Sequence, residues 1–563
     1  MKKIPYGISD FKLLKTEDYF FIDKTDYIPK IENHTSRYLM FLRPRRFGKS
    51  LLIAILEAYY DIGFKDEFEA IFKDTYIINN KTKEASSYMI LRFDFSAIDI
   101  YDVEESFRYD LQLTLKRFVR RYNLDIQFGS DNPISMFKNI FDYILDNHLN
   151  LYILIDEYDN FANRLFLKNR EDYLDIVTQK TAPFKQFFTT LKAGASGNNA
   201  PIKRMFITGV TPMTMYDVTS GFNIGRNISL DTEFHNMIGL NSRELDNALQ
   251  EYNLKDKVDK SLLEEWYNHY IFSEKAIEPI YNTDMILYFI DEFIKHYELP
   301  REMIDINVRS DYSKLKSIIY TNKKLNGNFK TLQTLIGGES ISISNLIQDF
   351  SALNLHKEEN FKSFMFYLGL VTIKDRGFDL NLKIPNETVK RIDIDFLASA
   401  LELEKIFEIN ITTLQTHLKA FALHGDLEVF RYLALMIKEN TGIRDYIYTE
   451  QTVKSMYLAY LSLTPYYIIK SEEELNKGFA DIFLKPFNPY IKFVGLVEFK
   501  YIKRSQVPTK ELIDVLVENA KNQLERYKLD ELVQNYLKDG LKLQMLVIVF
   551  WGWEMVYCEE YKN

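Results

Sequence analysis

The stretch "RPRRFGKS" at residues 43–50 has the residue types of a phosphate-binding loop. It follows the apolar run "RYLMFL" and precedes "LLIAILEAYY", which predicts a strand, a tight turn and a helix. The N–H groups of such a turn and the positive end of the helix favour bound phosphate. Gly48 would let the backbone approach closely, Lys49 would reach the β- and γ-phosphates, and the Ser50 hydroxyl would bind Mg²⁺. We therefore predict an ATP site formed by Arg45, Arg46, Phe47, Gly48, Lys49, Ser50 and Leu51.

Arg43 stands where the common form of this loop, G-x-x-x-x-G-K-[ST], has glycine. That position begins the turn and does not touch phosphate, and Pro44 can pre-set the backbone next to it. Arg45 and Arg46 add positive charge near a triphosphate, although both are also compatible with ordinary surface positions. The departure therefore does not exclude nucleotide binding.

An acidic strand end follows at "LYILIDEYD", residues 151–159. A buried strand that ends in carboxylates can hold Mg²⁺ and an attacking water beside a phosphate loop. Asp156 would hold Mg²⁺ through water and Glu157 would polarise the attacking water, whereas Asp159 would either assist or be structural. Thr208, at the end of the next apolar run, would sense the γ-phosphate. Together with the loop, these residues predict ATP hydrolysis.

A second constellation lies in "GFADIFLKPFNPYIKFVGLVEFKYIK", residues 478–503, which predicts a β-hairpin turning at "FNPY". A turn centred at residues 489 and 490 pairs residues whose numbers sum to about 979, which places Asp481 across from Glu498. Glu498 and Lys500 are two apart and share a face. The carboxylates would coordinate Mg²⁺, and Lys500 would orient or deprotonate water, which suits phosphodiester hydrolysis. A salt bridge on a surface hairpin is the alternative.

Other residues could complete this second site. Glu450, on the predicted helix "TEQTVKSMYLAYLS", could supply a third carboxylate for the metal. Gln523 and Tyr527 lie four apart on one face of another predicted helix. Basic residues between 482 and 510 could contact nucleic acid or form a solvated face; they are Lys485, Lys492, Lys500, Lys503, Arg504 and Lys510.

The elements that must position these residues predict a multidomain α/β protein. Apolar runs at 37–42, 88–96, 149–159 and 202–210 read as strands, and amphipathic stretches at about 49–61, 103–122 and 180–194 read as helices. This alternation predicts a parallel sheet with helices on both faces in a nucleotide-binding domain at 1–238. A helical lid or adaptor at 239–335 and a mainly helical linker at 336–440 would follow, and an α/β domain would occupy 441–563.

Composition excludes several classes of protein. The single cysteine, Cys558, rules out an internal disulfide and a cysteine zinc site and fits a cytoplasmic location. There is no apolar run long enough to span a membrane and no secretory signal pattern. The net charge of −9 excludes a chain-wide basic field for nucleic acid, so such binding must come from local patches.

Four motifs together resemble a bacterial AAA-ATPase-like family whose members end in a PD-(D/E)XK nuclease domain: "FFIDKTDYI", "RPRRFGKS", "ILIDEYD" and "MFITGVTPM". In that family the phosphate loop carries the Arg43 form. The resemblance implies ATP and Mg²⁺, with Mn²⁺ as an alternative at the nuclease site, and it implies nuclease roles for Glu450, Asp481, Glu498 and Lys500. It also marks Asp23, Lys24 and Thr25 as a signature near the nucleotide. The family often has Gly-Arg-x-Asp before the first catalytic acid, whereas "GFAD" stands here.

Three functions follow from these patterns. The first is an ATP-dependent, metal-dependent nuclease that acts on DNA rather than RNA. The second is a nucleotide-driven switch whose C-terminal domain binds nucleic acid or protein without cutting. The third is an assembly ATPase that forms a homo-oligomer through the ATPase domain, with Arg226 as a candidate arginine finger or an ordinary surface arginine. The intact Asp481, Glu498 and Lys500 favour the first function. The net charge of −9 favours the second, because a strong non-specific DNA binder is usually more basic.

Overall fold

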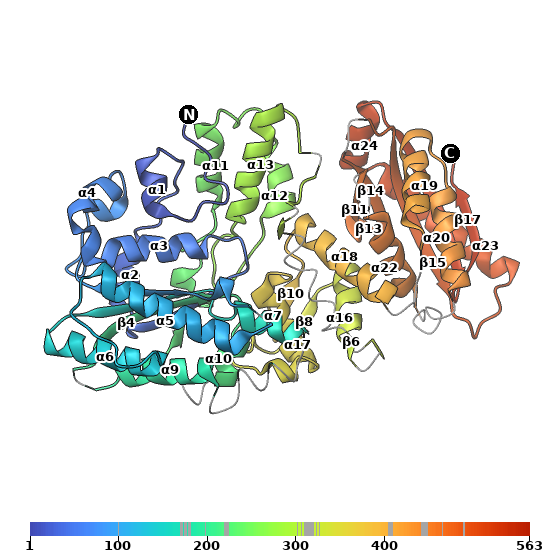
Figure 1. The fold of residues 1–563 in the computed structure, drawn as a ribbon. Coiled ribbons are helices and arrows are strands. Elements are labelled where there is room, and N and C mark those ends of the chain that lie inside the picture. The colour runs from blue at the N-terminus through green and yellow to red at the C-terminus, as the bar shows by residue number, and fades with distance from the viewer. Residues whose placement is uncertain are drawn as a thin grey trace. The chain divides into compact units, whose positions relative to one another are not determined.

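The computed structural model describes residues 1–562 except 100, 169–172, 174–176, 178–181, 198, 219–223, 301, 306, 309–319, 322–323, 326, 404–408, 441–448, 464–465 and 488–489. The chain divides into two compact units (Figure 1). One comprises Met1–Val308 and Ile343–Leu380, and the other comprises Arg309–Ser342 and Asn381–Asn563. Each unit is built around its own five-stranded sheet.

The sheet of the first unit is parallel, with the strand order β2-β3-β4-β1-β5. The four apolar runs predicted as strands form β1 (Tyr38–Leu42), β2 (Met89–Asp94), β3 (Leu151–Asp156) and β4 (Ile202–Gly209). β5 (Arg226–Asn227) is a short edge strand. β3 is buried along its whole length, which explains its uninterrupted apolar sequence, because both faces of a parallel sheet are covered.

Helices cover both faces of this sheet. In Figure 1, α3 (Lys49–Tyr60) lies above the sheet, and α6 (Pro133–Asp146) and α9 (Pro183–Gly194) lie below it. The predicted α5 (Val103–Arg121) packs against β2 and α6. α6 was not among the predicted helices, although Asn132 caps it by accepting from the N–H of Ile134 and Pro133 occupies its first turn.

The remaining elements of the first unit are short helices and one strand. They are α1 (Phe11–Thr16), α2 (Tyr27–Asn33), α4 (Phe68–Ile71), α7 (Asn160–Lys168), α10 (Met213–Val218), α11 (Ser242–Glu251), α12 (Lys260–Tyr267), α13 (Thr283–His296), α17 (Glu358–Leu368) and β9 (Thr372–Arg376). Two boundaries between the units fall within strands, one in β8 (Ile341–Ile343) and one in β10 (Leu380–Lys383). α16 (Gly327–Ile336) belongs to the second unit. The region expected to be mainly helical from 336 to 440 thus contains short strands as well.

The sheet of the second unit has the order β11-β14-β15-β16-β17. Its strands are β11 (Tyr467–Lys470), β14 (Ile482–Pro486), β15 (Phe493–Ile502), β16 (Lys542–Trp551) and β17 (Glu554–Glu560). β15 and β16 are parallel, and the other neighbours are antiparallel. β12 (Glu473–Leu475) and β13 (Gly478–Ala480) form a small hairpin immediately before β14.

α23 (Lys510–Lys528) packs on one face of this sheet and forms a core with β15 and β16. That core includes Val494, Leu496 and Ile502 of β15, which occupy the same face as Glu498 and Lys500 because alternate residues share a face. The other helices of the unit are α18 (Glu387–Leu403), α19 (Ile411–His424), α20 (Glu428–Glu439), α22 (Glu450–Leu461) and α24 (Glu531–Lys538). The face of β15 that carries this apolar core therefore also carries Glu498 and Lys500, between Leu496 and Ile502.

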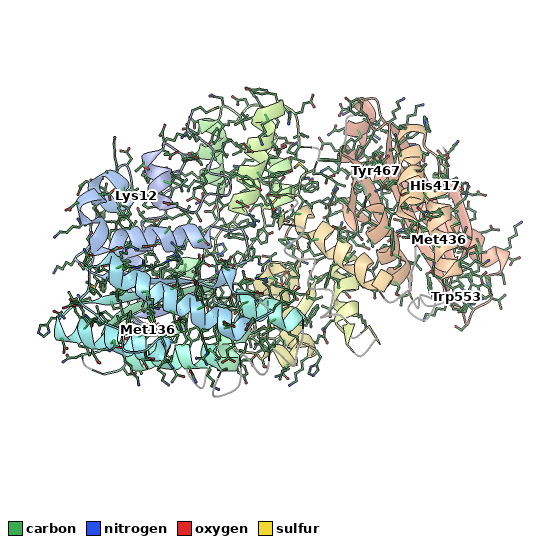
Figure 2. All side chains as sticks on the ribbon, in the orientation of Figure 1. Lys12, Met136, His417, Met436, Tyr467 and Trp553 are labelled. Carbon is green, nitrogen blue, oxygen red and sulfur yellow. The ribbon has the colours of Figure 1, made fainter. Side chains whose placement is uncertain are left out.

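Side chains fill both units densely with apolar contacts (Figure 2). None of the helices in the described ranges combines the length and apolar character needed to cross a bilayer.

Candidate functional site

The loop between β1 and α3 has the backbone geometry that a phosphate site needs. Gly48 begins α3 with a φ of 102°, and Arg46 has a φ of 69°. This left-handed region is open to glycine and uncommon for arginine, so the turn is tight. The first N–H groups of a helix have no acceptor within it, and residues 49–51 therefore offer donors where phosphate is predicted.

Lys49 lies across this loop with only 6% of its surface exposed. Its Nζ donates to the backbone oxygens of Arg43 at 3.0 Å and Pro44 at 2.9 Å. Burial lowers the pKa of Lys49, and negative charge at the end of β3 acts in the opposite direction. The acids responsible are Glu157, Asp156 and Asp159. The predicted phosphate-binding lysine is thus close to the predicted acidic strand end.

Asp156 and Thr208 meet at the ends of neighbouring strands. The hydroxyl of Thr208 donates to Oδ1 of Asp156 at 2.7 Å, and the N–H of Glu157 donates to the same oxygen at 3.1 Å. Nη2 of Arg92 lies 3.9 Å from Oδ2 of Asp156. The structure therefore joins two residues that the sequence suggested separately, and it adds Arg92, which no motif indicated.

Glu157 follows Asp156 in a left-handed conformation, with a φ of 49°. Asn160 donates from Nδ2 to its Oε2. Burial raises the pKa of Glu157, and the ammonium of Lys49 acts against this rise. A carboxylate with a raised pKa suits a group that positions or activates water near neutral pH.

Asp159, for which the sequence left two roles open, is structural. It is 1% exposed and accepts from the N–H of Val210 at 3.0 Å and from the N–H and hydroxyl of Thr211 at 2.7 and 3.0 Å. These bonds tie the end of β3 to the segment after β4. Gly209 is required by this approach, because a Cβ there would come within 2.4 Å of the Tyr158 ring.

Two predicted nucleotide contacts use their side chains for other purposes. The ring of Phe47 packs edge-on against Tyr270 and Phe272, with centroids 4.9 and 5.5 Å away. Nη1 of Arg46 lies 3.2 Å from Oδ2 of Asp284 in the first turn of α13. The side chains of residues 46 and 47 therefore anchor the loop to the helical region, and a nucleotide contact of Phe47 would come from its main chain.

Arg43 is a structural residue of the core and is 1% exposed. Its guanidinium donates to the backbone oxygens of Leu42 at 2.9 Å, Ser229 at 2.6 Å and Phe234 at 3.2 Å. It also lies 4.5 Å from the centroid of the Phe272 ring. Arginine replaces the usual glycine because it fastens the end of β1 to the segment after β5.

The Asp23–Thr25 signature also holds segments together. Oδ1 of Asp23 accepts from the N–H of Thr25 at 2.9 Å, and its Oδ2 accepts from the N–H of Tyr76. Nζ of Lys24 lies 2.7 Å from Oε1 of Glu244, the residue that completes the capping box of α11. These contacts tie the N-terminal segment to distant parts of the first unit.

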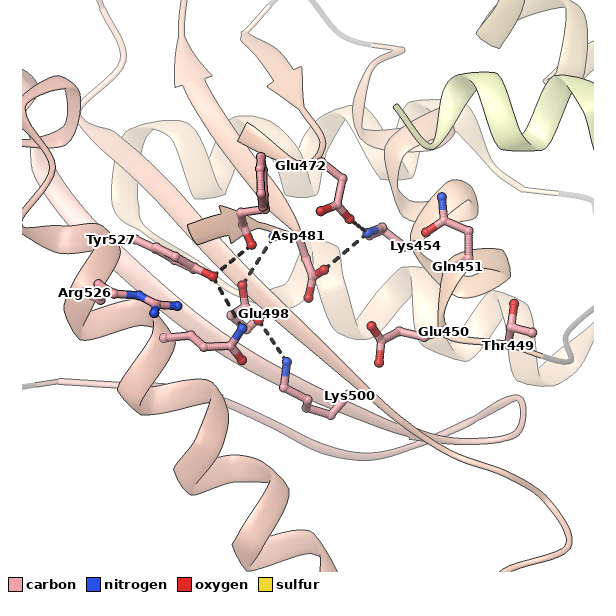
Figure 3. Close-up of a pocket in the computed structure, with 12 residues that line it drawn as sticks. Thr449, Glu450, Gln451, Lys454, Glu472, Asp481, Glu498, Lys500, Arg526 and Tyr527 are labelled. Atoms are coloured by element: carbon pink, nitrogen blue, oxygen red, sulfur yellow. Dashed lines mark hydrogen bonds and ion pairs between the residues drawn. The ribbon is translucent and has the colours of Figure 1, made fainter. Parts of the chain in front are cut away.

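In the second unit, a pocket of about 620 Å³ opens where α22, the β13–β14 corner, β15 and α23 meet (Figure 3). The acids suggested from the sequence line this pocket, as do Lys500, Gln523 and Tyr527, together with residues that no motif indicated. Of the basic residues predicted between 482 and 510, Lys500 lines it and the others do not. The lining residues are Thr449, Glu450, Gln451, Lys454, Glu472, Phe479, Asp481, Glu498, Lys500, Gln523, Arg526 and Tyr527.

The strand register brings Asp481 to Glu498. β14 and β15 pair Ile482 with Val497 and Leu484 with Gly495, which confirms the expected register. Residues 488 and 489 of the predicted turn "FNPY" lie outside the described residues. Asp481 is the residue immediately before β14, and its carboxylate accepts a hydrogen bond from the N–H of Phe499 at 2.8 Å. The Asp481 carboxylate therefore accepts the hydrogen bond that a main-chain carbonyl of a paired strand would otherwise accept from Phe499.

Two lysines neutralise part of the acidic charge. Nζ of Lys500 lies 2.9 Å from Oε2 of Glu498. Nζ of Lys454 lies 3.3 Å from Oδ1 of Asp481 and also pairs with Glu472, as Figure 3 shows. Lys454 is four residues after Glu450 on α22, and this spacing was the one sequence signal that could have identified it.

The two lysines do not offset all of the negative charge of the acids in the pocket. Burial and then the charge of Asp481 raise the pKa of Glu498 to about 8. Burial and Asp481 also raise the pKa of Glu450. Burial lowers the pKa of Lys500, but the surrounding acids outweigh it and raise this pKa above its usual value. Lys500 therefore carries its proton at neutral pH.

The pocket fits a divalent cation by its donor chemistry. Across the described ranges, no three acidic, histidine or cysteine side chains form a ready-made metal cluster. Glu450, Asp481 and Glu498 nevertheless offer the carboxylate oxygens that Mg²⁺ prefers. Each carboxylate oxygen has two lone pairs, so an oxygen of Asp481 or Glu498 that accepts one hydrogen bond keeps a second acceptor position. The repulsion that raises the pKa of Glu498 is what a bound cation would relieve.

The basic patch is not a continuous free surface. Lys500 lies in the pocket. The guanidinium carbon of Arg504 lies 3.5 Å from the Trp551 ring centroid, and Nη2 of Arg504 lies 3.1 Å from Glu554. At least these two cations are therefore engaged within the unit.

Family models of known proteins match separately the two parts of the chain that carry the two candidate sites. Residues 5–219 match the family model described as a predicted AAA-ATPase, and residues 448–560 match that of the PD-(D/E)XK nuclease superfamily. A curated relative, an uncharacterized protein in the vnfD 5′ region of Azotobacter chroococcum mcd 1, is 24% identical over 298 residues, which cover 51% of this chain and 52% of the relative. The match thus spans about half of that relative.

Solved structures give a looser likeness. The Aeropyrum pernix ORC2 protein in its ADPNP–ADP complexes has a TM-score of 0.31 and 12% identity, covering 67% of this chain and 92% of that one. The Aeropyrum pernix ORC1 protein in complex with DNA has a TM-score of 0.27 and 10% identity, covering 69% and 96%. The two family matches thus show a predicted AAA-ATPase domain at residues 5–219 and a domain of the PD-(D/E)XK nuclease superfamily at residues 448–560.

Proposed function

We propose that this protein binds and hydrolyses ATP in its first unit and cleaves phosphodiester bonds of nucleic acid, DNA in preference to RNA, in its second. The observation that carries the nuclease proposal is the pair of buried carboxylates, Asp481 and Glu498, joined at one strand corner with Lys500 on Glu498. A module that only bound nucleic acid would gain nothing from two adjacent carboxylates, where burial and then the charge of Asp481 raise the pKa of Glu498.

At the ATPase site, main-chain N–H groups of residues 45–51 and the ammonium of Lys49 would bind the phosphates of ATP. Ser50 and Asp156 would hold Mg²⁺, Glu157 would position the attacking water, and Thr208 would sense the γ-phosphate through Asp156. The lowered pKa of Lys49 is compatible with a group that gains stability when phosphate charge arrives.

At the nuclease site, Glu450, Asp481 and Glu498 would hold Mg²⁺, with Mn²⁺ as an alternative. A bound divalent ion polarises phosphate oxygens and makes a bound water more acidic. Lys500 would act as a charged donor that orients water or offsets charge on the phosphate oxygens. Despite its burial, the neighbouring acids raise the pKa of Lys500, which favours this charged form. The other role predicted from the sequence, in which Lys500 removes the proton from water, stays a prediction.

The domain limits 1–238, 239–335, 336–440 and 441–563 are proposed as functional boundaries, as are a cytoplasmic location and homo-oligomer formation through the ATPase domain. The candidate arginine finger, Arg226, is 59% exposed and lies 3.7 Å from Asp231.

The deciding experiment is cleavage of single- and double-stranded DNA and RNA by the full chain. It uses Mg²⁺ or Mn²⁺, each with and without ATP, and Lys500→Ala as the control. Cutting that Lys500→Ala removes would support the nuclease, and its ATP dependence would reveal coupling. ATP hydrolysis without any cutting would support the nucleotide-driven switch instead.

A further inference from the structure

The nuclease pocket has a second wall that the proposed cleavage chemistry does not use. Phe479 of β13 and Arg526 of α23 lie on it. Figure 3 shows Arg526 on the other side of Asp481 and Glu498 from Glu450 and Lys454. Arg526 therefore lies apart from Glu450, the acidic residue of α22.

Phe479 is 55% exposed, although it follows the buried Gly478 and precedes the buried Ala480. On a strand, successive side chains point to opposite faces, so the ring is directed away from the core that its neighbours enter. A large exposed aromatic ring that lines a charged pocket is a candidate contact for a ligand.

Arg526 is exposed, and in the described part of the chain its guanidinium has no ion pair with an acid. Its position is nevertheless built into the fold. A Cβ at residue 478 would come within 2.8 Å of its Nη2 and within 2.7 Å of the Tyr527 ring, so only glycine leaves room there. The Tyr527 hydroxyl donates to the backbone oxygen of Phe479 at 2.9 Å. Arg526 is thus held against the strand that carries Phe479.

The chemistry of the two side chains indicates one kind of ligand. A guanidinium without an acidic partner is suited to a phosphate, which it can bind through paired N–H groups. An exposed aromatic ring stacks on nucleobases whose faces are free. The bases of a duplex are stacked on one another, so the ring can reach a base only in a single-stranded, frayed or extruded segment.

We propose that this wall binds one nucleotide of single-stranded nucleic acid, with its base on Phe479 and a neighbouring phosphate on Arg526. The inference rests on the proposed function of the same pocket and specifies its substrate class. Phe479 lies two residues before Asp481, so the bound nucleotide would be next to the phosphate that is cut.

The test is binding by the full chain carrying Lys500→Ala, with Mg²⁺ present, so that cleavage does not interfere. The probes are a fluorescein-labelled oligo-dT of about 12 nucleotides and a blunt hairpin duplex of similar length, read by anisotropy at several salt concentrations. We expect Phe479→Ala to weaken binding of oligo-dT by roughly tenfold and to change duplex binding by less than about twofold. Arg526→Met should reduce the slope of log K against log salt by about 0.7 on the single strand.

Two exposed residues outside the pocket provide matched controls. Tyr490→Ala removes an aromatic ring that is 78% exposed, and Lys538→Met removes an exposed cation on α24. Both should leave single-strand binding within about twofold of the parent chain, apart from a small salt effect of the lost charge. The proposal is overturned if Phe479→Ala behaves like Tyr490→Ala, if both probes lose affinity together, or if the parent chain binds neither probe.

Cleavage by chains with Lys500 intact separates this inference from the proposed function. If no chain cuts but oligo-dT binding depends on Phe479 and Arg526, the nuclease proposal fails and the inference stands. If the wild type cuts, and Phe479→Ala and Arg526→Met cut single strands as well as it does, the inference fails and the nuclease proposal stands.

Discussion

The main-chain N–H of Asp481 donates to Oε1 of Glu498 at 3.3 Å. In the opposite direction, the Asp481 carboxylate accepts a hydrogen bond from the main-chain N–H of Phe499, the residue after Glu498. The two acids are therefore positioned by the backbone at the point where β14 begins and β15 continues. A substitution that keeps side-chain size should leave this corner folded and change only its charge.

Asp481→Asn should abolish cleavage, by at least about a hundredfold, because it removes a carboxylate that would hold the metal. ATP turnover should stay within about twofold of the wild type, since the ATPase residues belong to the other unit. The measurement is a paired assay of both activities, with Glu474→Gln on exposed β12 as a matched control. Loss of both activities in a folded Asp481→Asn protein would contradict separate sites.

Lys49→Ala should reduce ATP turnover by at least about a hundredfold, because it removes the ammonium that crosses the loop to the backbone oxygens of Arg43 and Pro44. Ammonium–phosphate contact is lost, so nucleotide affinity should fall as well. The check is steady-state ATP hydrolysis and nucleotide binding, with Lys83→Ala, an exposed lysine of the same unit, as the control. Undiminished turnover would exclude the loop as the catalytic nucleotide site.

Glu498→Gln should stabilise the chain at pH 8 and have a smaller effect near pH 5. The folded-state pKa of Glu498 is about 8, well above the ordinary value for Glu. Between the ordinary value and about 8, the folded protein binds more protons at this site than the unfolded chain does. The contribution of this group to stability is therefore lost as the pH rises through that window.

We expect the gain at pH 8 to be at least about 1 kcal/mol, since each unit of pKa difference corresponds to about 1.4 kcal/mol. Thermal unfolding of the full chain at several pH values measures it, in the absence of added metal. Glu474→Gln provides the control for loss of one exposed negative charge. A Glu498→Gln effect that is the same at pH 5 and pH 8 would show that the carboxyl does not titrate in this range.

Arg43→Met should lower the free energy of unfolding of the first unit by about 2–4 kcal/mol. The change leaves three buried carbonyl groups, those of Leu42, Ser229 and Phe234, without their donor. Because these bonds fasten the start of the loop, the affinity for ATP should fall too. Urea unfolding of the full chain tests the stability, and Arg226→Met, at an exposed arginine, should change it by less than about 0.5 kcal/mol.

The sequence alone identified most of the elements that carry the two sites. Apolar runs predicted β1 to β4, because strands buried on both faces need continuous apolar residues. The position of the predicted turn gave the register that places Asp481 beside Glu498, because a short turn fixes how the two strands pair. α6 was missed even though Asn132 and Pro133 are good start signals.

Local pattern determined the residue types and spacing of both sites: a phosphate loop between a strand and a helix, and acids with a lysine on one hairpin. Only the tertiary structure decided that Arg43 fastens the core and that Asp159 is structural. It also decided that Lys454, Glu472, Phe479 and Arg526 share a pocket with Asp481 and Glu498. These contacts join residues distant in the sequence through strand pairing and helix docking, and such pairings depend on which surfaces pack together, which local periodicity does not specify.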